Sequence, residues 1–121
     1  MTDGVSLAPW LAVRDAARAV EFYRAAFGAE EVYRLDGDGG TVAVAQLRVG
    51  GSDFWVQHEP DAGGAGPVRM ILSVPDPDAA FARAVAAGAT VVFPVGEEHG
   101  WRTGRLTDPF GYDWETSRRV G

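Results

Sequence analysis

Three of the four tryptophans, together with four polar side chains, are the residues of this chain best suited to binding a small molecule. An indole ring stacks on planar, partly apolar molecules, and stacking contributes about 0.5–1.5 kcal/mol per ring pair beyond burial. Amide, hydroxyl, guanidinium and carboxylate groups can hydrogen-bond the polar parts of the same molecule. The candidate binding residues are Trp10, Trp55, Gln57, Arg69, Ser73, Trp101 and Glu115. This set predicts an aromatic small-molecule ligand.

The residues that enzymes use for covalent catalysis are scarce. The chain has no cysteine, and it contains neither a Gly-x-Ser-x-Gly nucleophile elbow nor a phosphate-binding P-loop. The two histidines are predicted to be exposed, His58 at a strand end and His99 in the loop 96–100. A shift of one residue in the strand register would turn His58 to the other face, where it becomes a candidate metal ligand. With the register as assigned, we predict no metal site.

An internal repeat sets the organisation of the chain. The segment Leu11-Ala-Val-Arg-Asp15 precedes an Ala-rich stretch that ends at Gly28, and 61 positions later Leu72-Ser-Val-Pro-Asp76 precedes a similar stretch that ends at Gly88. Two units of about 4–59 and 68–119, joined by the Gly- and Pro-rich linker 59–67, therefore make a single domain over 1–121. Because a cleft between two half-domains is a common ligand site, we expect the ligand there.

Each unit is predicted to have the order βαβββ. In the first, a strand over 5–13 leads to a helix capped by Asp15, and strands follow over 31–35, 41–49 and 53–58. In the second, a strand over 68–74 leads to a short helix capped by Asp76, and strands follow near 90–94, 102–107 and 112–118. The predicted fold class is α+β: two tandem βαβββ units forming a curved, cup-like mixed sheet with the helices on the outside.

Strand alternation divides the side chains between the two faces of the sheet. Leu11 and Val13, like Leu72 and Val74, are predicted to pack under the helices. The opposite, concave face then carries Trp10 from the first unit and Arg69 and Ser73 from the second. The same alternation on the last strand of each unit turns Trp55, Gln57 and Glu115 toward the cup. Trp114 has the opposite parity to Glu115 and is predicted to lie in the core.

Composition excludes several classes of partner. The 121 residues carry a net charge of −6, which disfavours nucleic acid as a partner. No apolar run approaches the roughly 20 residues of a membrane span, and the N-terminal residues do not resemble a signal peptide. We therefore expect a cytoplasmic protein with no membrane partner. All 11 basic residues are arginine, which is typical of a GC-rich bacterial genome.

These motifs together resemble the vicinal oxygen chelate superfamily, which is also called the glyoxalase/bleomycin resistance protein/dioxygenase family. The resemblance spans nearly the whole chain and rests on Val13-Arg-Asp15, Ala19-Val-Glu-Phe-Tyr23 and Phe27-Gly-Ala29 in the first half. In the second half it rests on Trp101, Gly104-Arg105 and Asp108-Pro-Phe-Gly-Tyr-Asp-Trp-Glu115. The combination is specific, whereas any one of these motifs alone would be weak.

The resemblance also implies four metal-ligand positions, which are His, Glu or Gln in metal-dependent members. Carried over by distance from the motif residues, they fall on Ala8, Trp55, Arg69 and Glu115. Alanine cannot ligate, tryptophan offers only an N–H donor, and arginine is a permanent cation. We therefore expect no metal and no other cofactor. Two arrangements remain open: an ion pair between Arg69 and Glu115 where the metal would have been, or Arg69 on a rim carboxylate with Glu115 in solvent.

Three functions are consistent with these residues. The first is a metal-independent small-molecule-binding protein that sequesters an aromatic natural product or antibiotic, as drug-binding members of the superfamily do. The alternative is a glyoxalase-type lyase or isomerase, or a dioxygenase, with an atypical or metal-free site in which Glu115 is the general base. An adjacent Arg69 would keep Glu115 charged, which suits ligand binding better than proton transfer. The third is a domain that acts mainly as a dimerisation module. We expect a homodimer, since relatives often assemble as homodimers, in some cases by exchanging halves.

Overall fold

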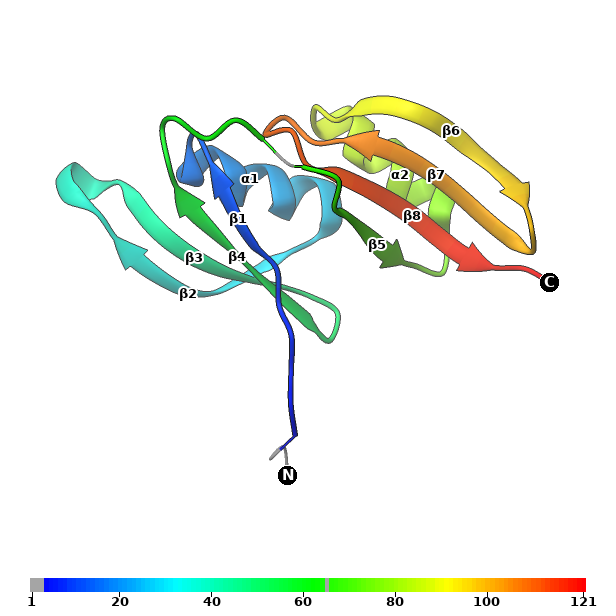
Figure 1. Ribbon diagram of the computed structural model, residues 1–121, viewed down its shortest axis with the longest axis horizontal. Coiled ribbons are helices and arrows are strands. Elements are labelled where there is room, and N and C mark those ends of the chain that lie inside the picture. Colours follow the sequence, from blue (N-terminus) through cyan, green and yellow to red (C-terminus); the bar gives the residue numbers. More distant parts are fainter. Residues whose placement is uncertain (1–3, 65) are drawn as a thin grey trace.

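The computed structural model describes residues 4–64 and 66–121, and it contains two βαβββ units in tandem (Figure 1). The strands of the first unit lie in the order β1-β4-β3-β2 and those of the second in the order β5-β8-β7-β6. The first unit comprises β1 Trp10–Val13, α1 Ala16–Phe27, β2 Glu30–Asp36, a 3₁₀ turn Asp38–Gly40, β3 Val42–Val49 and β4 Ser52–His58. The second comprises β5 Arg69–Ser73, α2 Pro77–Ala87, β6 Thr90–Glu98, β7 Trp101–Thr107 and β8 Asp113–Arg119. The predicted fold class is confirmed.

The helix caps predicted from the sequence are present in the structure. The Asp15 carboxylate accepts a hydrogen bond from the backbone N–H of Arg18, and the Asp76 carboxylate accepts one from that of Ala79, each at 3.1 Å. Both aspartates therefore satisfy an N–H of the first helical turn that has no partner within the helix. Gly28 ends α1 in the left-handed conformation, with φ 68°.

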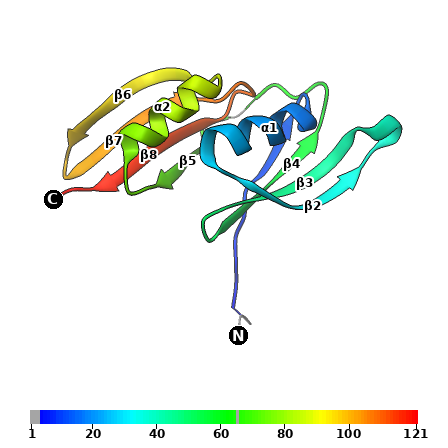
Figure 2. The ribbon, with the colours of Figure 1, turned by 180° about the vertical axis from the view of Figure 1, so that it is seen from behind.

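The eight strands form two separate four-stranded sheets that do not close into one. Each sheet has a parallel pair between its first and last strands, so that Trp10 lies opposite Trp55 and Ile71 lies opposite Glu115. The two helices lie together on one side of the molecule (Figure 2), and the Arg83 Nε of α2 donates to the carbonyl of Ala25 in α1 at 2.7 Å. The sheets therefore present their open faces away from this helix layer.

Some predicted boundaries are wrong. The strand expected over 5–13 begins only at Trp10. Pro9 still accepts a hydrogen bond from the backbone N–H of Trp55 at 2.9 Å, but residues 4–8 extend away from the body (Figure 1). The strand expected near 90–94 continues to Glu98, so the predicted loop 96–100 is reduced to a tight turn at His99 and Gly100. Trp101 is consequently the first residue of β7, not part of a loop.

An aromatic cluster joins the two units. Tyr23 and Phe27 of α1 pack on Trp114 of β8, with ring centroids 5.7 and 4.6 Å apart. Trp114 is 4% exposed, as its parity predicts. At the centre of the cluster the buried carboxylate of Asp108 accepts hydrogen bonds from the Tyr23 hydroxyl and from Trp114 Nε1. The same carboxylate thus links α1 of the first unit to β8 of the second.

Burial is the main cause of the raised pKa values of Asp108 and Tyr23. It raises the pKa of Asp108, although the hydrogen bonds that the carboxylate accepts act in the opposite direction. Burial, followed by the nearby Asp108 charge, raises the pKa of Tyr23 well above its ordinary value. Tyr23 therefore keeps its proton at neutral pH and remains a hydrogen-bond donor to Asp108.

Candidate functional site

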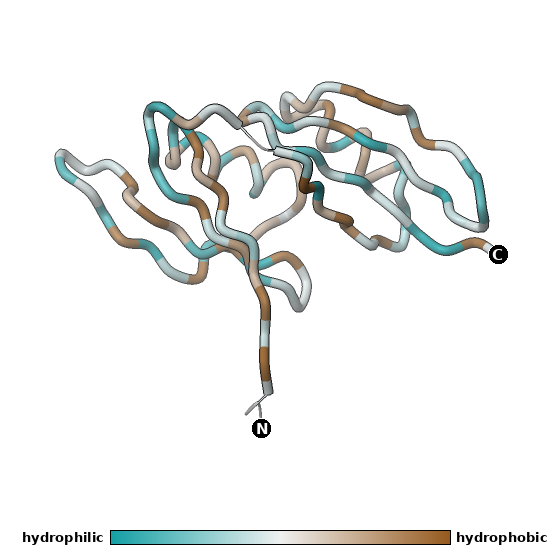
Figure 3. The backbone as a smooth tube through the Cα atoms, in the orientation of Figure 1, coloured by the Kyte–Doolittle hydropathy of each residue, from teal (hydrophilic) through white to brown (hydrophobic). Residues whose placement is uncertain are grey.

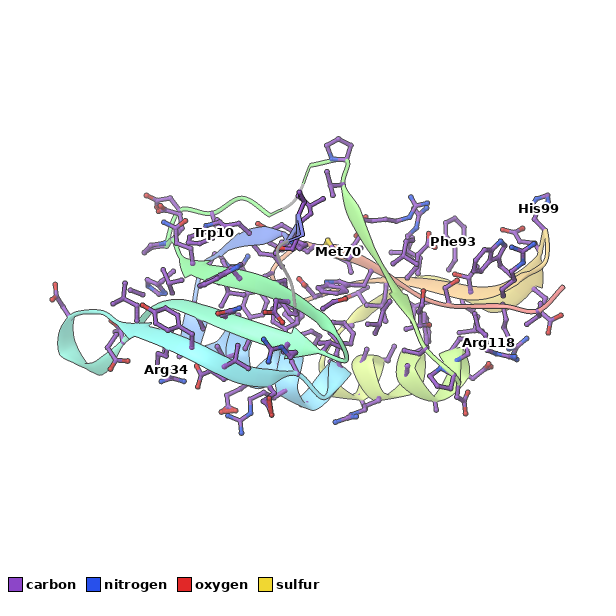
Figure 4. All side chains as sticks on the ribbon, turned by 90° about the horizontal axis from the view of Figure 1, so that it is seen from below. Trp10, Arg34, Met70, Phe93, His99 and Arg118 are labelled. Carbon is purple, nitrogen blue, oxygen red and sulfur yellow. The ribbon has the colours of Figure 1, made fainter. Side chains whose placement is uncertain are left out.

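A pocket of about 790 Å³ lies on the second sheet, on the face opposite α2. Residues from all four strands of this sheet line it, and Phe93 and His99 project on this side (Figure 4). Pockets of roughly 300–1,000 Å³ hold drug-sized molecules. The pocket is therefore large enough for an aromatic ligand of two or three rings.

An ion pair occupies the floor of this pocket. Arg69 Nε of β5 lies 2.5 Å from Glu115 Oε1 of β8, so of the two arrangements left open by the sequence the structure contains the ion pair. Arg105 Nε of β7 lies 3.8 Å from the same Oε1 atom, and the Thr103 hydroxyl is 3.4 Å from Glu115 Oε2. The Glu115 side chain is 16% exposed, whereas that of Arg69 is 42% exposed. A mostly buried carboxylate is thus shared by two guanidinium groups.

Two aromatic rings form the apolar part of the pocket. Phe93 of β6 is 60% exposed, and the Arg105 guanidinium carbon lies 5.4 Å from the centre of its ring. Trp101 at the start of β7 is 41% exposed and lies beneath Arg119 at 5.9 Å. Rings this exposed in the free protein have flat surface available for a planar molecule.

A second aromatic group lies on the open face of the first sheet. Trp10 and Trp55 stack with centroids 5.8 Å apart and planes inclined by 22°, and Trp10 Nε1 donates to Gln57 Oε1 at 2.9 Å. Tyr33 of β2 meets Trp55 edge-on at 6.0 Å. Trp10 lies over the first unit and Phe93 over the second (Figure 4).

The structure therefore divides the predicted binding residues into two groups. Arg69, Trp101 and Glu115 line the pocket of the second sheet, while the group of Trp10, Trp55 and Gln57 lies on the first sheet and not in this pocket. Ser73 is exposed at the end of β5, outside the pocket lining.

Comparison with known proteins decides the family. A profile described as Glyoxalase/Bleomycin resistance protein/Dioxygenase superfamily matches residues 5–116. The chain belongs to this superfamily. An uncharacterized protein of Mycobacterium bovis (strain ATCC BAA-935 / AF2122/97) is 38% identical over 128 residues, which cover 95% of this chain and 84% of that protein.

Two solved structures have the same arrangement of helices and strands as this chain. TioX from Micromonospora sp. ML1 is 31% identical, with a TM-score of 0.78 over 97% of this chain and 100% of that one. A gene product of Arabidopsis thaliana is 33% identical, with a TM-score of 0.77 over 95% of this chain and 99% of that one. Members of the superfamily bind small molecules, which agrees with a ligand pocket on the sheet.

The metal that many members of the superfamily use does not fit the residues present here. Of the four positions that the family implies, Ala8 precedes β1, Trp55 is stacked on Trp10, and Arg69 lies against Glu115. A cation 2.5 Å from the one carboxylate of this set would repel a divalent metal. Within residues 4–64 and 66–121, no three His, Cys, Asp or Glu side chains are grouped so as to hold a metal ion.

One of the two histidines, His58, is less exposed than predicted. His58 is half-buried at the end of β4, where its Nδ1 accepts a hydrogen bond from the backbone N–H of Ala16 at 3.1 Å. It therefore holds the start of α1 and is not simply an exposed strand-end residue. His99 is exposed in the turn between β6 and β7, as expected, and it lines the outer end of the pocket.

The sequence interpretation missed Arg105, Phe93 and Thr103. Arg105 and Thr103 lie opposite Glu115 and Ser117 in the antiparallel pair of β7 and β8, so strand alternation could have placed them on the pocket face. Phe93 is harder to predict, because the register of β6 and β7 shifts on both sides of it.

No helix within the described ranges 4–64 and 66–121 has the length and apolar character of a membrane span.

Proposed function

We propose that this protein is a cytoplasmic small-molecule-binding member of the superfamily that holds an aromatic ligand in the second-sheet pocket without a metal. The observation that carries the proposal is the contact of Arg69 Nε with Glu115 Oε1 at 2.5 Å. It puts a permanent cation at a position where metal-dependent members need a donor. Sequestration of a drug or natural product fits the superfamily, whose description includes bleomycin resistance proteins.

The surroundings of Glu115 favour binding over catalysis. A general base must have an oxygen free to take a proton from the substrate. Glu115 Oε1 is instead engaged by Arg69 Nε at 2.5 Å, with Arg105 Nε at 3.8 Å. The exposed rings of Phe93 and Trp101 supply the surface on which a planar ligand would lie.

We further propose a homodimer in which the first sheet of one copy covers the second sheet of the other. The first-sheet face bears Trp10, 53% exposed, and Leu35, 51% exposed; the second bears Ile71, 54% exposed, with Phe93. Exposed large apolar side chains on both faces support an interaction surface. The hydropathy tube in Figure 3 shows further apolar stretches in the segment before β1 and in β6. A second copy would bring Trp10, Trp55 and Gln57 to the pocket.

Native mass spectrometry tests the metal and the dimer together. We expect a species of twice the 12.9 kDa chain mass, with no stoichiometric metal in the purified protein and none retained after exposure to divalent ions. A chelator should change neither the mass nor the assembly. About one metal ion per chain, lost on chelation, would contradict metal independence. A monomer as the sole species would contradict the dimer.

A further inference from the structure

The charges at the floor of the pocket do not balance. Arg69 and Arg105 both face the single carboxylate of Glu115, so the three groups have a net charge of +1. We propose, on the basis of the proposed binding function, that the ligand is a planar aromatic carboxylate whose anionic group binds Arg105 and Arg69. The ring system of the ligand would then lie on Phe93 and Trp101.

Arg105 is the residue that most needs a further partner. Its Nε is buried, yet it has no hydrogen-bond partner among residues 4–64 and 66–121. The nearest carboxylate oxygen, Glu115 Oε1, is 3.8 Å away and lies closer to Arg69 Nε, at 2.5 Å. Since the Arg105 side chain is 28% exposed although its Nε is covered, a ligand carboxylate would bind the terminal N–H groups of the guanidinium and supply the charge partner that the residue lacks. A carboxylate matches the planar guanidinium in shape and charge.

The acidic residues at the pocket rim do not cancel this charge. Glu97 and Glu98 also line the pocket. In the strand register of β6 and β7, however, Glu97 lies opposite Arg102 and Glu98 lies opposite Trp101. These positions are three and four residues from Arg105 along β7. At about 3.4 Å per residue they lie about 10–14 Å away along the strand. This exceeds the Debye length of about 8 Å at physiological ionic strength. Glu97 is also 59% exposed and paired with Arg102 at 3.4 Å.

The aromatic residues place the ring of the ligand next to the cations. The Arg105 guanidinium already packs on Phe93, at 5.4 Å from the ring centre. A ring stacked beside Phe93 therefore carries its carboxylate close to Arg105 and Arg69. The geometry thus favours a carboxylate attached directly to the aromatic system over one on a long flexible chain.

Calorimetric titration with 2-naphthoate and 2-naphthamide tests the proposal, since the two probes share the ring system and differ in charge. At physiological ionic strength, where the charges of Glu97 and Glu98 are screened, we expect naphthoate to bind at least about tenfold more tightly than naphthamide. Arg105→Gln should weaken naphthoate about tenfold and change naphthamide by less than about twofold. Arg34→Gln, which removes an exposed arginine of the first unit, is the matched control and should change neither affinity.

Glu115→Gln is the second variant, and its expected effect has the opposite sign. It removes the carboxylate that competes for both arginines, so naphthoate affinity should rise. Equal binding of the two probes by the wild type would overturn the anionic ligand while leaving the proposed function in place. Weaker naphthoate binding by Glu115→Gln would also overturn it. Absence of binding by either probe would contradict the proposed function itself.

Discussion

Asp108→Ala is expected to lower the free energy of unfolding by about 3–5 kcal/mol. The carboxylate, 3% exposed, accepts hydrogen bonds from the Tyr23 hydroxyl, from Trp114 Nε1 at 2.9 Å, and from the backbone N–H groups of Phe110 and Tyr112 at 2.8 and 3.0 Å. Alanine leaves these donors without their acceptor, and each buried donor without a partner costs about 1–3 kcal/mol. The hydrogen bonds that would be lost lie at the contact between the two units.

Urea unfolding followed by tryptophan fluorescence measures this effect, because Trp114 lies in the same cluster. Asp61→Ala, which removes an exposed carboxylate from the linker, is the control and should change the free energy of unfolding by less than about 0.5 kcal/mol. A loss below about 1 kcal/mol for Asp108→Ala would show that Asp108 does not hold the units together.

Phe93→Ala is expected to weaken the binding of 2-naphthamide by about tenfold or more. The variant removes a ring on which the ligand would stack, and the lost stacking and burial amount to about 1.5–2 kcal/mol. Since Phe93 is 60% exposed, we expect little change in the free energy of unfolding. Calorimetric titration measures the affinity, and thermal unfolding confirms that the variant is folded.

Val92→Ala is the matched control for this substitution. Val92 is adjacent in β6 and 41% exposed, but it does not line the pocket. Its substitution should leave the affinity for 2-naphthamide unchanged. Equal affinities of Phe93→Ala and the wild type would place the aromatic ligand elsewhere, with the Trp10–Trp55 stack on the first sheet as the next candidate.

The fold could be predicted largely because its signals are local. The caps Asp15 and Asp76 and the alternation in the first strand, where Leu11 is 4% and Val13 0% exposed, depend on near neighbours along the chain. The separation of the strands into two sheets could not be predicted in this way. A repeat specifies the elements of each unit but not how the two units pack. Here the units are joined by long-range contacts of α1, with Trp114, with Asp108 and with Arg83 of α2.

The candidate site was predictable only in part. The resemblance to the superfamily places Arg69 and Glu115 at neighbouring positions and leaves an ion pair as one of two arrangements; the structure contains the pair. Phe93 could not be predicted, because the register shifts around it interrupt the alternation on which face assignments depend. His58 could not be assigned either, since its partner is the backbone N–H of Ala16, 42 residues away in the sequence.

We propose above that the second-sheet pocket binds an aromatic molecule without a metal. Titration of the wild-type protein with 2-naphthamide, before and after exhaustive treatment with a chelator, tests it most directly. We predict saturable binding at one site per chain, with the same affinity in both samples. No binding, or binding that disappears with the chelator and returns with a divalent metal, would contradict metal-independent binding in this pocket.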